Sequence, residues 1–157
     1  MVSYDYRVLQ QKHQYGPAQI EKGCRIGDIL VQVSQIPFLR DRLSLYGGTA
    51  LNFIHFTQPQ RLSVDIDFNY RHQGEKKDWG EIRREIDDTY KQILYAQGYQ
   101  AEDIRIDASY PLSRFTVNYT NHQGTNDSIK IETGYMRRMP ILNRDAHMSF
   151  HHMGSDM

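Results

Sequence analysis

The chain has 157 residues, of which 39% are hydrophobic and 24% charged, as in ordinary globular domains, which excludes a disordered or fibrous protein. Its 19 basic and 19 acidic residues cancel, so a strongly basic nucleic-acid-binding protein is disfavoured, although a local basic patch stays compatible with the composition. The single cysteine cannot form an internal disulfide, the first residues are too polar for a signal peptide, and no apolar run reaches the roughly 20 residues of a membrane helix. We therefore expect a cytoplasmic protein with no membrane partner.

The first part of the chain, residues 17–40, is predicted to be a packing helix region. Its apolar residues recur mostly at spacings of three and four, which is the period of a helix with one buried face. Pro37 is expected to end or kink this helix, because proline lacks the N–H donor that a helix interior needs. The apolar positions are Ile20, Ile26, Ile29, Leu30, Val33 and Ile36.

A strand, a glycine turn and a helix are predicted next, over Leu43–Tyr46, Gly47-Gly48 and residues 49–56. Residues 63–70 then alternate strictly between polar and apolar side chains, which predicts a strand with one buried and one polar face. The apolar side is Val64, Ile66 and Phe68, and the polar side is Ser63, Asp65, Asp67 and Asn69.

The rest of the chain predicts one helix and three strands. Residues 79–99 carry apolar side chains at helical spacing and end near Gly98, a residue typical of helix C-termini. Residues 104–107 alternate as a strand, and residues 113–120 and 128–135 alternate on either side of a polar loop that contains Gly124. That arrangement predicts a β-hairpin.

Asp65 and Asp67 are candidate metal ligands. Two residues apart on one strand, they leave the same face with Cα atoms roughly 6.5 to 7 Å apart, close enough to converge on one or two cations. Carboxylate oxygens favour Mg²⁺ or Mn²⁺. An Asp-x-Asp pair is a weak motif alone, because two solvated acids on an exposed strand face give the same pattern.

Gly47, Gly48 and Thr49 form a candidate phosphate-binding turn. Bare backbone N–H groups between a strand and a helix can hold phosphate oxygens at the helix N-terminus, and Thr49 adds a hydroxyl. A tight turn with Thr49 as N-cap would satisfy the same pattern without any ligand. Together with the carboxylate pair on the next strand, however, this turn predicts a site for a metal-bound nucleoside triphosphate.

Two motifs of this chain together resemble the signature of the AbiEii/AbiGii-type nucleotidyltransferase toxins. They are Gly-Gly-Thr-Ala-Leu at 47–51 and Arg-Leu-Ser-Val-Asp-Ile-Asp-Phe at 61–68. These toxins belong to the DNA polymerase β-like superfamily, and the resemblance extends over about residues 43–141. It implies an α+β fold with a mixed sheet flanked by helices, Mg²⁺ on Asp65 and Asp67, and NTP phosphates at the glycine turn. It also implies transfer of a nucleoside monophosphate to an acceptor that can be a tRNA end, and an antitoxin partner, often in phage defence.

The superfamily uses a third carboxylate on a later strand, for which Glu132 and Asp107 both have suitable alternation. The resemblance favours Glu132, which would complete the metal site. Lys130, two residues earlier, could contact phosphate or could be a solvated strand lysine. Arg61 and Ser63 belong to the second motif, and Arg61 could bind phosphate or pair with an acid near the strand.

The expected organisation is a nucleotidyltransferase domain over residues 1–145, with its catalytic core at 43–141, and a disordered tail at 146–157. Members of the family usually continue into a helical C-terminal region, so we expect this chain to be a short form. Two alternatives to a transferase follow. One is a catalytically impaired remnant that binds NTP or a partner protein. The other is a metal-dependent nuclease, which is disfavoured because it needs no glycine phosphate turn and usually orders its strand pair as Glu-x-Lys.

Overall fold

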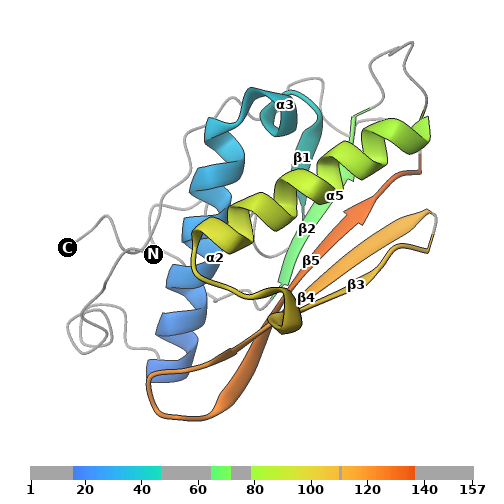
Figure 1. The fold of residues 1–157 in the computed structure, drawn as a ribbon. Helices are drawn as coiled ribbons and strands as arrows, with labels where there is room; N and C mark the ends of the chain where they lie inside the picture. Colours follow the sequence, from blue (N-terminus) through green and yellow to red (C-terminus); the bar gives the residue numbers. More distant parts are fainter. Residues whose placement is uncertain (1–15, 47–64, 72–78, 110, 137–157) are drawn as a thin grey trace.

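The computed structural model describes residues 16–46, 65–71, 79–109 and 111–136 (Figure 1). In these residues helices and strands build a mixed α+β structure. The helices are α2 (Pro17–Gln35), α3 (Pro37–Arg40) and α5 (Trp79–Ala96), with a 3-10 turn at Ala101–Asp103. The strands are β1 (Leu43–Tyr46), β2 (Asp65–Tyr70), β3 (Ile104–Asp107), β4 (Leu112–Thr120) and β5 (Asn126–Gly134).

The five strands form one sheet in the order β1-β2-β5-β4-β3. β2 and β5 run parallel to each other in the middle of the sheet, and every other neighbouring pair is antiparallel. The parallel pair arises because α5, β3 and β4 intervene in the chain between β2 and β5. The mixed sheet that the resemblance implied is therefore confirmed.

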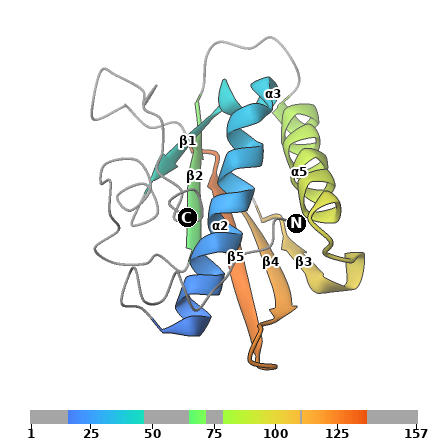
Figure 2. The same ribbon diagram turned by 90° about the vertical axis from the view of Figure 1, so that its left-hand side faces the viewer.

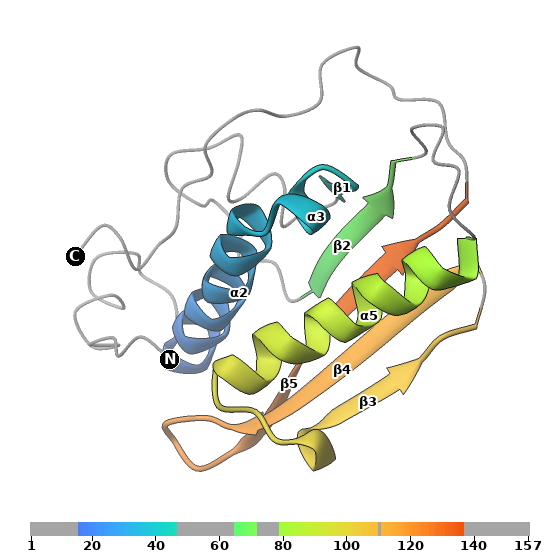
Figure 3. The same ribbon diagram turned by 45° about the horizontal axis from the view of Figure 1, so that its top comes forward.

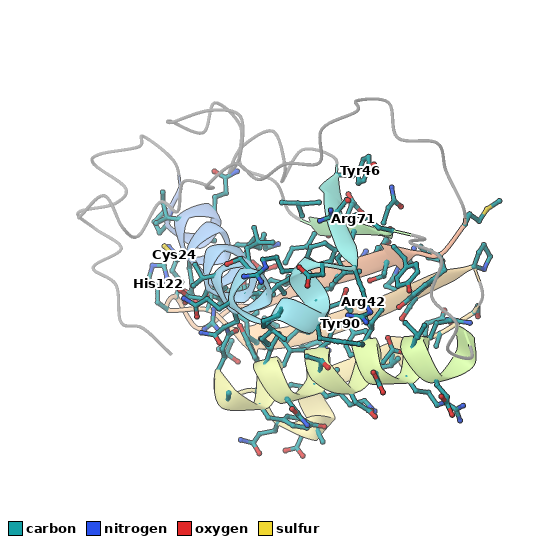
Figure 4. The ribbon with its side chains drawn as sticks, turned by 90° about the horizontal axis from the view of Figure 1, so that it is seen from above. Cys24, Arg42, Tyr46, Arg71, Tyr90 and His122 are labelled. Carbon is teal, nitrogen blue, oxygen red and sulfur yellow. The ribbon has the colours of Figure 1, made fainter. Side chains whose placement is uncertain are left out.

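One face of the sheet carries the core, and α2 and α5 both cover that face (Figures 2 and 3). On β2, Ile66 and Phe68 are buried while Asp65 and Asp67 are only partly so, as the alternating sequence predicts. Tyr90 of α5 lies between the helix and the sheet (Figure 4) and shares a buried hydrogen bond with Thr133 of β5, 2.9 Å between their hydroxyl oxygens. The helices thus fix which face of the sheet is left for polar side chains.

The predicted N-terminal helix ends where its sequence indicates. α2 stops at Gln35, and Ile36 adopts an extended conformation because the ring of the following proline disfavours a helical one. Pro37 then opens the short helix α3, since the first turn of a helix leaves N–H groups unpaired in any case. The chain thus turns back into β1, and Arg71 donates to the carbonyl oxygens of Arg40 and Leu43 at this turn.

Two glycines with positive φ end the other predicted elements. Gly98 follows α5 with φ of 100°, and Gly124 lies in the β4–β5 loop with φ of 80°, a conformation that other residues seldom adopt. In the same loop Oδ1 of Asn121 accepts hydrogen bonds from the backbone N–H groups of Gln123 and Thr125, both at 3.0 Å. The loop closes with Thr120 paired to Asn126, which sets the register of the hairpin.

The remaining sequence predictions fall outside the described residues. They are the helix at 49–56, the first two positions of the strand at 63–70 and the tail at 146–157. The predicted hairpin is present, with strands that begin one and two residues earlier than expected, at Leu112 and Asn126.

Candidate functional site

The face of the sheet opposite the helices carries polar side chains in two rows that cross the strands. In the first row, Asp65 on β2 is paired with Lys130 on β5, and Lys130 with Thr116 on β4. In the second, Asp67 is paired with Glu132, and Glu132 with Arg114. Neighbouring strands are about 4.8 Å apart, so three of the predicted acids occupy one small area of this face.

Both rows continue to the edges of the sheet. β1 ends at Tyr46, directly opposite Asp67, and Tyr46 is 39% exposed. At the other edge β3 adds Asp107 beyond Arg114 and Arg105 beyond Thr116. The face is therefore acidic on β2, mixed on β5, and basic or neutral on β4.

Asp67 lies where negative charge accumulates. Partial burial, then the charges of Glu132 and Asp65, raise the pKa of Asp67 above its ordinary value. Within the described residues, no side chain or backbone N–H donates to the carboxylate of Asp67, and no cation forms an ion pair with it. The charge of this carboxylate is left uncompensated by the described part of the protein.

Glu132, in contrast, has a cationic partner. Nε of Arg114 donates to Oε1 of Glu132 at 2.7 Å, and the two side chains are 43% and 26% exposed. The pairing follows from the hairpin register, which places the two residues opposite each other on adjacent strands. One carboxylate oxygen of Glu132 is thereby occupied.

Asp107, the alternative third carboxylate, is separated from the other acids. It lies on the edge strand β3, with β4 and β5 between it and β2. It is exposed, and its carboxylate accepts a hydrogen bond from the hydroxyl of Ser109 at 2.9 Å. The structure therefore brings Asp65, Asp67, Lys130 and Glu132 together and leaves Asp107 apart.

The donor chemistry of this area suits a divalent cation. Asp65, Asp67 and Glu132 offer only hard carboxylate oxygens, and a cation would relieve the repulsion that raises the Asp67 pKa. In the described part of the chain, however, no three His, Cys, Asp or Glu side chains already form a cluster that could hold a metal ion. The backbone places the three carboxylates on adjacent strands, while the Glu132 carboxylate is engaged by Arg114.

A close approach between backbone and side chain occurs in the next row along the strands. Asn69 of β2 is paired with Gly134 of β5. A Cβ at residue 134 would lie 2.7 Å from Oδ1 of Asn69, shorter than a normal contact between these atoms. Gly134 thus leaves the room that the Asn69 side chain occupies beside the carboxylates.

The other residues predicted for the site lie outside the described ranges: Gly47, Gly48, Thr49, Arg61 and Ser63. In the chain Gly47 directly follows Tyr46, the residue opposite Asp67. Ser63 precedes Asp65 by two residues. The two ends of the undescribed segment are therefore bonded to strand residues at or next to the carboxylate rows.

Two other kinds of function gain no support from the structure. The thiol of Cys24 is fully buried, and burial raises its pKa to about 12, so it does not ionise as a nucleophile near neutral pH. Among the residues described, no helix is long and apolar enough to cross a membrane.

A family model described as "Nucleotidyl transferase AbiEii toxin, Type IV TA system" matches residues 28–150. The chain belongs to the AbiEii family. The match covers more than half of the chain and extends on both sides of the region, 43–141, in which the resemblance is evident from motifs. No curated protein and no solved structure matches the chain significantly.

Membership in AbiEii assigns the chain to a family of nucleotidyl transferase toxins of type IV toxin-antitoxin systems. The structure adds two residues to the acidic area that the sequence analysis missed, Tyr46 and Arg114. The sequence could have indicated Arg114, because it occupies a polar position in the alternating predicted strand 113–120. A hairpin loop that contains Gly124 and pairs residues 120 and 126 also pairs 114 with 132.

Proposed function

We propose that this AbiEii-family protein transfers a nucleoside monophosphate from an NTP to an acceptor, with Mg²⁺ or Mn²⁺ held by Asp65, Asp67 and Glu132. The observation that carries the proposal is the register of β2 and β5, which sets Asp67 beside Glu132 and Asp65 beside Lys130. A polar strand face with three carboxylates and one lysine matches the needs of phosphoryl transfer, where the protein supplies positioning and charge.

Each residue then has a distinct part in the reaction. When bound, a divalent metal would supply positive charge to offset the charge of the triphosphate and of the leaving pyrophosphate. Asp65 and Asp67 would hold that metal from one strand, and Glu132 would complete the set from the next. Lys130, exposed and adjacent to Asp65, contacts a phosphate oxygen of the NTP.

The turn at Gly47, Gly48 and Thr49 is proposed to hold the NTP phosphates through its N–H groups and hydroxyl. Arg61 and Ser63 are proposed to contact the same phosphates. The position of Tyr46 opposite Asp67 supports this assignment, because Gly47 directly follows Tyr46 in the chain.

Asp107 is excluded from the ligand set in this proposal. Two strands separate it from β2, a span of roughly 14 Å at the usual strand spacing. Carboxylate side chains cannot close that distance to share one cation with Asp67.

The acceptor is proposed to be RNA, with tRNA ends as the first candidate, and the partner an antitoxin protein, as the family description implies for a type IV system. The exposed ring of Tyr46 could stack on a base of such an acceptor, and the basic side chains on the same face of β4 and β5, Arg114 and Lys130, could contact its phosphates. Phage defence in the cytoplasm is the proposed setting.

The proposal is tested by incubating the full chain with each α-³²P-labelled NTP, Mg²⁺, and either purified tRNA, total RNA or cell lysate. Label should pass to RNA with one NTP, and should not pass in the presence of excess chelator. Asp65→Asn should abolish transfer, whereas Asp107→Asn, a matched acid on the same sheet face, should retain it.

Other outcomes are equally informative. Binding of NTP without transfer to any fraction would identify a catalytically impaired remnant. Shortening of RNA in place of labelling would identify a nuclease and contradict the proposal. Transfer that is unchanged by Asp65→Asn would remove the metal site from β2.

A further inference from the structure

In the described part of the sheet, Arg114 forms an ion pair with Glu132, one of the three carboxylates proposed to bind metal. Its Nε donates to Oε1 of Glu132 at 2.7 Å. The two residues face each other across β4 and β5. Arg114 is also opposite Asp107 on its other side, but Asp107 takes its hydrogen bond from Ser109. Arg114 thus lies opposite an acid on each neighbouring strand and forms its ion pair with Glu132.

We propose that Arg114 is a positioning residue for Glu132, a role that rests on the metal site proposed above. The Nε–H bond holds one carboxylate oxygen, Oε1, and leaves the second oxygen for the cation. Glu132 would then bind through a single oxygen with its rotamer already set. Ligands that are oriented by a second hydrogen bond in this way bind metal more tightly than freely rotating ones.

The geometry of the contact explains why arginine stands at this position. The bond comes from Nε, whose single N–H lies in the plane of the rigid guanidinium, so the first three side-chain torsions set the position of the donor and the fourth sets its direction. A lysine keeps the positive charge but carries it on a freely rotating ammonium beyond that point. Arg114→Lys therefore removes orientation while retaining the local charge.

Arg105 supplies a matched control. It lies on the same sheet face, on the neighbouring strand β3, where it is opposite Thr116. It is exposed, and in the described structure no ion pair joins it to an acid. Arg105→Lys makes the same chemical change on the same face, one strand farther from β2, without touching the proposed metal ligands.

The experiment measures Mn²⁺ binding to the full chain by electron paramagnetic resonance, without NTP, so that the readout does not depend on turnover. Arg114→Lys should weaken Mn²⁺ binding about tenfold, the lower end of the range for outer-shell partners of metal ligands. Arg105→Lys should leave it unchanged. In a Glu132→Gln background Arg114→Lys should have no further effect, because the carboxylate that it orients is gone.

Several results would overturn the inference. Wild-type affinity in Arg114→Lys would make the contact a surface ion pair without function. An equal loss in the wild-type and Glu132→Gln backgrounds would show that Arg114 acts independently of Glu132. If Arg114→Lys proves unstable by circular dichroism, the same cycle is run with Arg114→Gln against Arg105→Gln.

Failure of the underlying metal site is distinguishable from failure of this inference. If wild type binds no Mn²⁺, or if Asp67→Asn binds it as wild type does, the proposed function fails. If Asp67→Asn loses Mn²⁺ while Arg114→Lys retains it, the metal site stands and only the role of Arg114 is lost.

Discussion

A carboxylate is at least partly buried in each of two regions of the molecule, and the two regions differ in whether its charge is compensated. Glu21 of α2 is 1% exposed and lies where the helix meets the β4–β5 loop. Asp67 lies on the other face of the sheet, beside Glu132 and near Asp65. Figure 4 shows His122, a partner of Glu21, beside α2 and away from Tyr46, which is opposite Asp67.

The protein compensates the charge of Glu21 almost completely. Nε of Arg25 donates to one of its oxygens at 2.9 Å, and the backbone N–H and the ring Nδ1 of His122 both lie 2.6 Å from the other. Burial alone would raise the pKa of Glu21, but the hydrogen bonds from His122 and Arg25, with the charge of Arg25, lower it. Glu21 is therefore ionised and fully partnered.

Arg25 is satisfied in its turn. Its Nη1 donates to the hydroxyl of Tyr99 at 2.8 Å, and its guanidinium lies over the ring of Tyr119, 4.1 Å from the ring centre. These contacts tie α2 to the chain after α5 and to β4. A buried charge held this way fixes how the elements meet.

The comparison contrasts a charge that the fold compensates with one for which we propose a role in metal binding. Glu21 has its counter-charge and donors within the fold, whereas the charges that raise the pKa of Asp67 are the carboxylates of Glu132 and Asp65. Like charges on one face cost stability unless a cation arrives from solution. Four predictions test this contrast at one or both regions, beginning with the largest expected effect.

Asp67→Asn should lower the rate of nucleotide transfer by about 10³-fold, equivalent to about 4 kcal/mol of transition-state stabilisation. The amide keeps the shape of the side chain but removes the charge that holds the metal. Glu21→Gln should leave the rate per folded molecule unchanged. Turnover of labelled NTP, normalised to the amount of folded protein by circular dichroism, measures the rate of each variant. A rate for Asp67→Asn near that of wild type would exclude Asp67 as a metal ligand.

Glu21→Gln should lower the free energy of unfolding by about 3 kcal/mol, because removing one partner of a buried pair leaves the charge of Arg25 uncompensated. Urea denaturation followed by circular dichroism measures this value. Glu102→Gln, an exposed acid in the turn after α5, is the control and should change stability by less than about 0.5 kcal/mol. An equally small effect of Glu21→Gln would show that the network contributes little.

The third prediction concerns the two candidates for the third carboxylate. Glu132→Gln should lower turnover about 100-fold, equivalent to about 2.7 kcal/mol, with a much smaller effect on NTP affinity, since the lost charge matters most in the transition state. Asp107→Asn should change turnover less than twofold. Steady-state kinetics with separate values of kcat and KM decide the ranking, and the reverse order would move the site toward β3.

The sequence predicted most of the fold because each element carries its own local signal. The alternation of residues 65–70, the helical spacing of residues 79–96 and the proline after Ile36 all depend on neighbouring residues alone. It was also predictable that one face of the sheet would carry Asp65, Asp67 and Glu132, because side chains along a strand point alternately to its two faces.

What the sequence analysis missed depends on contacts between distant segments. Glu21 and His122 are 101 residues apart in the chain, and nothing near Glu21 in the sequence distinguishes it from a solvated helix residue. Local alternation alone did not separate Glu132 from Asp107, so the sequence favoured Glu132 only through the family resemblance, and the strand order adds that Glu132 lies beside Asp67 while Asp107 does not. Arg114 became significant only once the hairpin register placed it opposite Glu132.

The last prediction is the smallest effect, a change in the free energy of unfolding whose sign is opposite to that expected for Glu21→Gln. The folded state raises the pKa of Asp67, so in the absence of metal the ionised carboxylate destabilises the fold at pH 7 relative to a neutral side chain. Asp67→Asn should therefore increase the free energy of unfolding in chelator by about 0.5 kcal/mol, within the range of partly exposed surface changes. Saturating Mn²⁺ should stabilise wild type but not the variant. Thermal unfolding with and without Mn²⁺ measures both effects, and a variant less stable than wild type in chelator would show that Asp67, like Glu21, serves the fold.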